Sequence, residues 1–197
     1  MDSYRTARLM QEGVTYPVIV RPHNQILENR INRIIRETAE ELLPSGRYRT
    51  MNIITAASEY ETTVNKNEIL SIRFENYYYP EMMASGITVV RAVTLNLVTG
   101  RRYRLKDLFI PGIDYEDYLN RLIERQIEER DIPLINDFPG ITGNEVFYLT
   151  EGELVIVYQR YELTPGYYGV LEFEIPYEEL QPLIDETSPI YMIAQNS

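Results

Sequence analysis

The chain has few of the side chains from which catalytic and metal sites are usually built. It contains no Cys and a single His, His23. A nucleophile–base–orienter triad, and a metal site built on His or Cys, each need more of these groups. Carboxylates are plentiful, but sequence spacing pairs no two of them as acid and base. Phosphate-cradling and nucleophile-elbow motifs are absent. We therefore expect no catalytic residue, no metal ion and no cofactor, and a structural or solvent-facing role for His23.

Tyrosine is the residue type in excess, with 17 copies and no Trp. Its large apolar ring and its hydroxyl suit a surface that stacks on sugars or packs against a protein. The same properties suit the half-wet face of a β-sheet, which is the alternative reading. In the run from Tyr77 to Tyr79, strand alternation places Tyr78 on the opposite face from its two neighbours. Only part of the run can therefore share one surface.

The Tyr-rich strand is followed by residues 80–86, a short loop that contains Met82 and Met83. Two adjacent Met side chains are difficult to bury together in such a loop, and exposed Met is common at adaptable binding surfaces. Two alternatives stay open: these side chains contact a partner, or they pack under the hairpin that follows. The candidate partner-binding residues are Tyr77, Tyr79, Met82, Met83, Tyr167 and Tyr168.

Charge and hydropathy exclude two classes of partner. With 19 Lys and Arg against 30 Asp and Glu, the net charge of −11 repels nucleic acid phosphates. The apolar runs fall far short of the ~20 residues that span a bilayer, so no membrane insertion is expected. A native start at Met1 predicts a cytoplasmic protein, whereas removal of a signal or an anchor predicts an extracytoplasmic one.

Capping residues and apolar periodicity predict two amphipathic helices. Asn24 is a suitable N-cap for the first helix and Asp114 for the second, because both side chains accept hydrogen bonds from exposed backbone N–H groups. Apolar residues follow each cap at three- and four-residue steps. The expected buried stripes are Leu27, Ile31, Ile34, Ile35, Ala39 and Leu42 in the first helix, and Tyr115, Tyr118, Leu119, Leu122, Ile123 and Ile127 in the second.

A short helix is predicted to begin at residues 178–181, before Pro182, and the remaining elements are predicted to be strands joined by hairpins. Alternating or extended patterns cover residues 15–20, 47–60, 68–79, 88–105, 146–149, 154–161 and 170–175. Gly100 supplies the left-handed turn of the 88–105 hairpin. We predict an α+β fold, with an antiparallel sheet built from successive hairpins and two main amphipathic helices packed on it. Residues 1–197 should form one domain, or two coupled lobes at about 12–87 and 88–186, with tails at 1–11 and 187–197.

Three segments carry a family resemblance: residues 69–74 (ILSIRF), 93–109 (VTLNLVTGRRYRLKDLF) and 153–169 (ELVIVYQRYELTPGYYG). They resemble a bacterial domain family, largely of unknown function. It includes the extracytoplasmic, lysozyme-sensing domain of RsiV anti-sigma factors and the non-catalytic domain of the PdaC peptidoglycan deacetylase. The resemblance implies a sensing or accessory domain.

The chain departs from this family at residues 80–86. Many relatives have a Gly-Gly-Ala-His-Gly tract there, of which only Gly86 is kept. Lysozyme recognition is therefore not carried over, and without an anchor or a sigma-binding segment no anti-sigma activity is expected from this chain alone. The favoured function is a stand-alone, non-catalytic binding or sensing module for an unknown protein or glycan ligand. The alternative is a cell-wall-associated accessory domain that binds glycan or a lytic enzyme.

Overall fold

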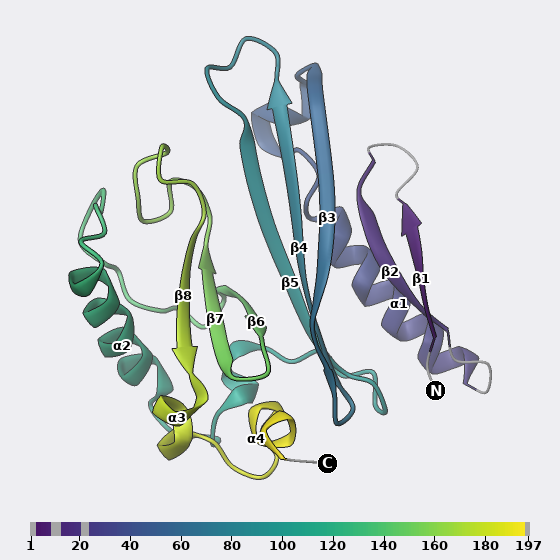
Figure 1. Ribbon diagram of the computed structural model, residues 1–197, viewed down its shortest axis with the longest axis vertical. Coiled ribbons are helices and arrows are strands. Elements are labelled where there is room, and N and C mark those ends of the chain that lie inside the picture. Colours follow the sequence, from purple (N-terminus) through teal and green to yellow (C-terminus); the bar gives the residue numbers. More distant parts are fainter. Residues whose placement is uncertain (1–2, 9–12, 21–23, 196–197) are drawn as a thin grey trace.

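Antiparallel strands and two long helices form the frame of the protein (Figure 1). The computed structural model describes residues 3–8, 13–20 and 24–195. The predicted α+β class is confirmed, and the hairpins are distributed over three sheets. These are a ribbon of β1 (Ser3–Arg8) and β2 (Thr15–Val20), a sheet of β3 (Ile53–Lys66), β4 (Ile69–Pro80) and β5 (Ile87–Asn96), and a sheet of β6 (Val146–Leu149), β7 (Glu153–Tyr158) and β8 (Leu171–Pro176).

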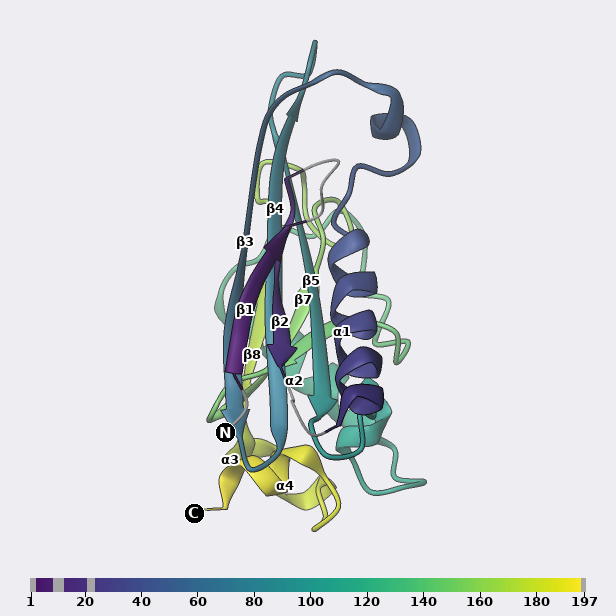
Figure 2. The ribbon, with the colours of Figure 1, turned by 90° about the vertical axis from the view of Figure 1, so that its right-hand side faces the viewer.

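Helix α1 (Gln25–Glu40) covers one face of the β3–β4–β5 sheet (Figure 2). Its N-cap is Asn24, as predicted, and the cap side chain accepts a hydrogen bond from the N–H of Leu27. The helix also holds β2, because the side-chain amide of Asn32 bonds both backbone groups of Ile19 at 2.8 Å. The buried members of this core are Val14, Ile19, Ile31, Ile35, Ala39, Leu42, Leu70, Ile72, Phe74, Val93, Leu95 and Leu97.

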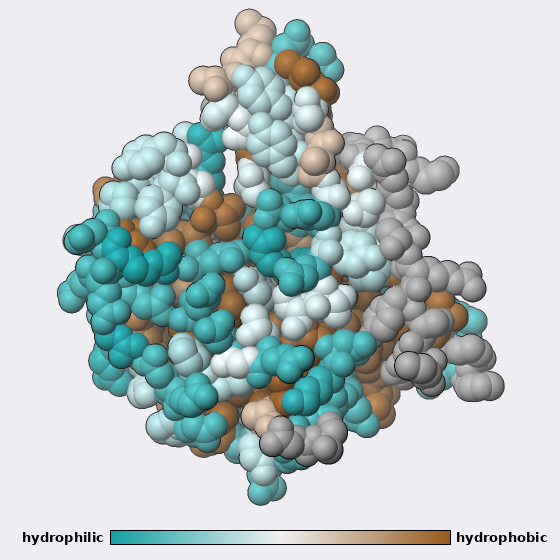
Figure 3. Space-filling model, in the orientation of Figure 1, coloured by the Kyte–Doolittle hydropathy of each residue, from teal (hydrophilic) through white to brown (hydrophobic). Residues whose placement is uncertain are grey.

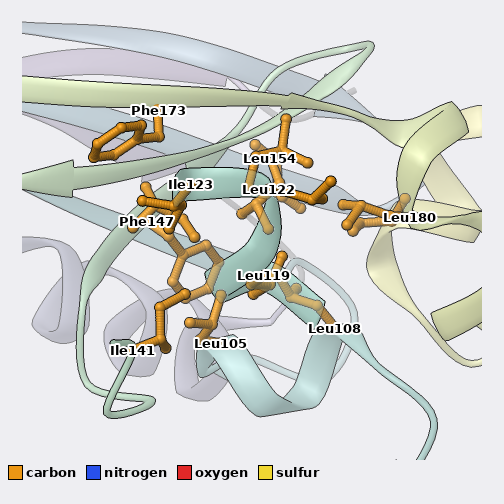
Figure 4. Packing of buried hydrophobic residues seen from close by; sticks show 14 of the residues in the cluster. Leu105, Leu108, Leu119, Leu122, Ile123, Ile141, Phe147, Leu154, Phe173 and Leu180 are labelled. Carbon is orange, nitrogen blue, oxygen red and sulfur yellow. The ribbon is translucent and has the colours of Figure 1, made fainter. Parts of the chain in front are cut away.

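Helix α2 (Tyr115–Glu129) covers the β6–β7–β8 sheet and forms the larger core (Figure 4). Asp114 caps it by accepting from the N–H of Asp117, again as predicted. Buried side chains of α2 meet inward residues of all three strands, and Figure 4 shows Phe147, Leu154 and Phe173 among them. The buried residues of α2 are Leu119, Leu122 and Ile123.

The two three-stranded sheets pack against each other between the helices. Val90 and Ala92 of β5 contact Tyr148, Val155 and Val157 of the second sheet in a small apolar cluster. Burial of these apolar groups joins the sheets without direct strand pairing between them.

A polar cluster adds to this junction. The Arg73 guanidinium donates to Glu172 at 3.0 Å, and the Tyr148 hydroxyl donates to the same carboxylate at 3.1 Å. Arg73 also pairs with Glu75 at 2.8 Å. Because these groups are mutually satisfied, the half-buried charges are tolerated between the sheets.

Three local features differ from the sequence-based expectations. Residues 47–50, placed at the start of the extended run 47–60, lie in the 3₁₀ helix η1 (Gly46–Thr50). The turn at Gly100 has φ 67°, as predicted, but the returning arm makes only the single bridge from Leu95 to Arg102. That arm leads instead into η2 (Leu105–Leu108). Strand β7 is shorter than predicted, since it ends at Tyr158 and not at residue 161, whereas β8 (Leu171–Pro176) has the predicted length.

The segments expected to be tails contain structure. β1 lies within the predicted 1–11 tail and pairs with β2. The 187–197 segment contains α4 (Pro189–Ala194), which follows α3 (Tyr177–Leu180) and η3 (Gln181–Leu183). Ile190 and Ile193 of α4 are fully buried, so this segment is part of the larger core. A six-residue helix escapes detection because it is too short to display a helical period.

No helix in the described part of the chain combines the length and the apolar composition required to cross a membrane.

Substitution within α1 tests the packing of this helix. Ile35→Ala should lower the free energy of unfolding by about 2–5 kcal/mol, because Ile35 is fully buried. Ile26→Ala is the matched control, since Ile26 on the same helix is 86% exposed and should change stability by less than about 0.5 kcal/mol. Chemical denaturation measures both values, and equal losses would show that the helix faces are misplaced.

Stability should fall at alkaline pH. Burial, and then the hydrogen bond to Glu116, raise the pKa of Tyr115 to about 12. Burial also raises the pKa of Tyr148, Tyr158 and Tyr177. An unfolded Tyr titrates near pH ~10. Above that pH the unfolded chain loses protons that the folded chain keeps, so stability is complete below it and declines as the pH rises toward ~12. Denaturation at a series of alkaline pH values measures the decline, which should be shallower in Tyr115→Phe; a flat profile would contradict the burial.

Candidate functional site

Two loops meet at one end of the β3–β4–β5 sheet. The first, residues 80–86, joins β4 to β5 and projects at the top of Figure 1; the second, residues 159–170, joins β7 to β8. Arg160 connects them. Its Nε donates to the Gly166 carbonyl at 2.7 Å, its Nη1 to the Gly86 carbonyl at 2.9 Å, and its Nη2 to Ser85 Oγ at 2.9 Å. One guanidinium thus holds both loops.

Each glycine that Arg160 contacts is covered by a tyrosine ring. A Cβ on Gly86 would lie 2.2 Å from the ring of Tyr77, and a Cβ on Gly166 would lie 2.2 Å from the ring of Tyr161. A larger residue at either position would require the tyrosine ring to move. The Arg160 guanidinium also lies 4.8 Å from the centre of the Tyr161 ring. The Tyr161 ring and the Arg160 guanidinium therefore position one another.

The side chains that these loops present to solvent are large and apolar. Met82 is 98% exposed, Tyr167 80% and Tyr161 60%. Met82 and Tyr161 also have positive φ angles, 65° and 70°, a conformation that a side chain disfavours. In the space-filling view the loop end of the molecule projects as a knob of mixed hydrophobic and hydrophilic residues (Figure 3).

A hollow of about 300 Å³ lies between the two loops, lined by Ser85, Gly86, Thr88, Arg160, Gly166, Tyr167, Gly169 and Val170. Flexible thioether and aromatic groups around a small hollow are suited to contact another molecule. We name this region the loop surface. It comprises residues 80–86, residues 160–169 and Tyr77.

Some of the predicted candidate residues are exposed to solvent, and others are half-buried beneath the loop. Tyr77, Met82 and Tyr167 are exposed, and Tyr168 is 36% exposed. Tyr79 is half-buried, and its hydroxyl donates to the Met83 carbonyl at 2.6 Å, so it supports the loop from within. Met83 is also half-buried. Tyr78 is buried on the opposite face, where its ring lies 6.2 Å from that of Tyr48, as alternation predicts. Their role in binding stays a prediction.

The sequence did not identify Arg160 and Tyr161 as members of the site. The available signal was the Gly- and Pro-punctuated segment 159–169, which is typical of a loop with a defined conformation. His23 lies outside the described residues. Within the described ranges, no three His, Asp or Glu side chains converge as metal ligands do.

Known proteins share similarity with this chain in sequence and in structure. Residues 106–178 match the model of a family described as a protein of unknown function, DUF3298. The anti-sigma-V factor RsiV of Bacillus subtilis strain 168 is 30% identical over 179 residues, which cover 83% of this chain and 61% of RsiV. The predicted resemblance to the RsiV-like family is confirmed. The chain spans about three fifths of the length of RsiV, and the match includes most of the elements described above.

Two solved structures share the fold. A DUF3298 family member from Bacteroides fragilis NCTC 9343 superposes with a TM-score of 0.65 at 16% identity, covering 100% of this chain and 96% of that one. A DUF3298 family protein from Pseudomonas aeruginosa PAO1 gives a TM-score of 0.64 at 13% identity, covering 95% of each chain. At these identities the likeness establishes the fold alone.

Replacing Arg160 tests whether it joins the loops. Arg160→Gln removes most of the donors that hold the Gly86 and Gly166 carbonyls. Amide hydrogen exchange in residues 81–87 and 166–169 should therefore accelerate, by about tenfold or more if the lost hydrogen bonds stabilise the closed loops by ~1.5 kcal/mol. Arg121→Gln is the control, since Arg121 makes an exposed pair with Asp117 on α2. Unchanged exchange in both loops would show that Arg160 does not join them.

Proposed function

We propose that this protein is a non-catalytic binding or sensing module that recognises a protein partner through the loop surface. The observation that carries the proposal is the Arg160 contact, which fixes two separate loops with Met82, Tyr161 and Tyr167 exposed. Ordering such loops before binding reduces the entropy lost on association. RsiV is named as an anti-sigma factor, and its similarity supports a regulatory role.

The composition of the loop surface favours a protein as the ligand. Protein interfaces are enriched in Tyr, Met and Arg relative to other surfaces, and Tyr is frequent among the residues that carry most of the binding energy. Here the Arg160 guanidinium, whose donors are already used within the protein, lies over the ring of Tyr161 and lines the same hollow as Tyr167. Recognition then depends on burial of rings and thioether groups, for which the partner needs a complementary apolar patch.

The alternative function is a cell-wall-associated accessory domain that binds glycan or a lytic enzyme. The exposed ring of Tyr167, which borders the hollow between the loops, favours this second candidate, because sugar rings stack on exposed aromatic side chains. Localisation outside the membrane would accompany this function.

Substitution of exposed loop residues separates these functions from a purely structural role. Met82→Ser combined with Tyr167→Ser should leave the melting temperature nearly unchanged, because both side chains are mostly exposed. The same variant should lose capture of a protein partner from extracts of the source organism. Ile26→Ser is the matched control: it removes an exposed apolar side chain from α1 and should retain the partner.

The same variants are tested for sedimentation with purified cell-wall glycan. Protein capture that depends on Met82 and Tyr167 supports the protein-binding module. Glycan sedimentation that depends on these residues supports the cell-wall-associated accessory domain. A large drop in melting temperature would mean that the loop residues serve the core. Equal capture by the wild type, the loop variant and the control would contradict the proposed site.

A further inference from the structure

A second hollow, of about 540 Å³, lies on a different part of the molecule. It is bordered by α1, by the middle of β5, by residues 101–105 and by residues 143–147. None of its lining residues belongs to the loop surface. Residues of α1 and residues that follow β5 both line it, so a ligand bound there would contact the first half of the chain and the second.

Arginine side chains are concentrated around this hollow. Arg30, Arg101, Arg102 and Arg104 line it, together with a single carboxylate among the described residues, Glu145. One oxygen of Glu145 is already engaged, because it accepts hydrogen bonds from the N–H and the hydroxyl of Thr142. The basic side chains therefore dominate this hollow, in a chain whose net charge is −11.

Three of these arginines lack a partner. Most arginines with described side chains pair with a carboxylate or donate to a carbonyl; Arg101, for example, donates to Asp107 at 2.8 Å. In the part of the chain that the structure describes, the arginine side chains without an ion pair or hydrogen bond are Arg30, Arg49, Arg102 and Arg104, and all but Arg49 line this one hollow. The single carboxylate of Glu145 offsets only part of this positive charge, and an anion would relieve the repulsion that remains among the guanidiniums.

Local structure fixes where these guanidiniums lie. Arg102 and Arg104 are two residues apart on an extended segment and therefore lie on the same side of it. Hydrogen bonds from the N–H of Asn96 to the Arg101 carbonyl and from the N–H of Tyr103 to the Thr94 carbonyl hold that segment against β5. Arg30 reaches the hollow from α1 and packs against the Gly100 turn. A Cβ added to Gly100 would lie 3.0 Å from Cδ of Arg30.

The rest of the lining is partly apolar and includes Ile34, Val93, Leu105 and Phe147. Guanidinium groups match carboxylate and phosphate oxygens through paired, charge-assisted hydrogen bonds. Apolar walls beside such groups accommodate the carbon skeleton of an organic ligand.

We infer that this hollow binds a small organic anion whose carboxylate or phosphate oxygens are held by Arg30, Arg102 and Arg104. The site is independent of the loop surface, so the proposed function and this inference stand or fall separately. Because binding relies on exposed guanidiniums, it weakens as the salt concentration rises.

Calorimetric titration of the full chain at low salt tests the site, with citrate as the carboxylate probe and tripolyphosphate as the phosphate probe. Saturable binding of either probe is expected, and the stronger one identifies the preferred oxyanion. Arg30→Gln combined with Arg102→Gln should weaken binding by about tenfold or more. Arg104→Gln alone should also weaken it. The exposed positions of these arginines make folding of the variants secure, and their melting temperatures without probe verify it.

The matched control is Arg33→Gln combined with Arg121→Gln, which removes the same charge from exposed helix pairs with Glu37 and Asp117. Its affinity for the probe should equal that of the wild type. Two results would overturn the inference: no saturable binding of either probe, or equal weakening in both double variants, since that would reflect net charge alone.

Discussion

The side-chain amide of Gln159 aligns the end of β7 with β5, where the second sheet meets the first. It accepts from the N–H of Val90 at 3.0 Å and donates to the Val90 carbonyl at 2.9 Å, as a neighbouring strand would. The end of β7 is thereby aligned with β5. Since Arg160 is the next residue after Gln159, its guanidinium arrives opposite Gly86, just before β5 begins. The loop surface depends on this alignment.

A similar contact joins helix α1 to strand β2. Asn32 of α1 bonds both backbone groups of Ile19 in β2, so a side-chain amide again completes the edge of a strand. Such contacts satisfy backbone groups at strand edges, which would otherwise be open to pairing with other chains. The apolar contacts supply most of the stabilisation, whereas these amides select one arrangement of the elements.

Local patterns predicted the two long helices well. Asn24 and Asp114 cap them as expected, and buried residues such as Ile31 and Leu119 fall on the predicted stripes. Periodicity and capping are properties of a few consecutive residues, so a single sequence contains them.

The site could be predicted only in part. Strand alternation correctly predicted that Tyr78 lies on the opposite face of the strand from Tyr77 and Tyr79, and residues 80–86 were predicted to form a loop. Arg160 was not recognised as a member, because its contact with Gly86 joins residues 74 positions apart in the sequence, and no local pattern encodes such a pairing. The same limit applies to the short helices η1 and α4. Their side chains pack against residues far away in the sequence, as Tyr48 does against Tyr78 and Ile190 does within the larger core. Neither helix is long enough to show a helical period in the sequence.

Site-specific photo-crosslinking in the source organism tests the central claim that the joined loops form the binding surface. A photoreactive residue is placed at the exposed position of Met82, and another at that of Ile26 on α1. The account predicts a defined crosslinked product from the Met82 position only, and its loss when Arg160→Gln is added. A product of equal yield from both positions, or one that is unaffected by Arg160→Gln, would contradict it.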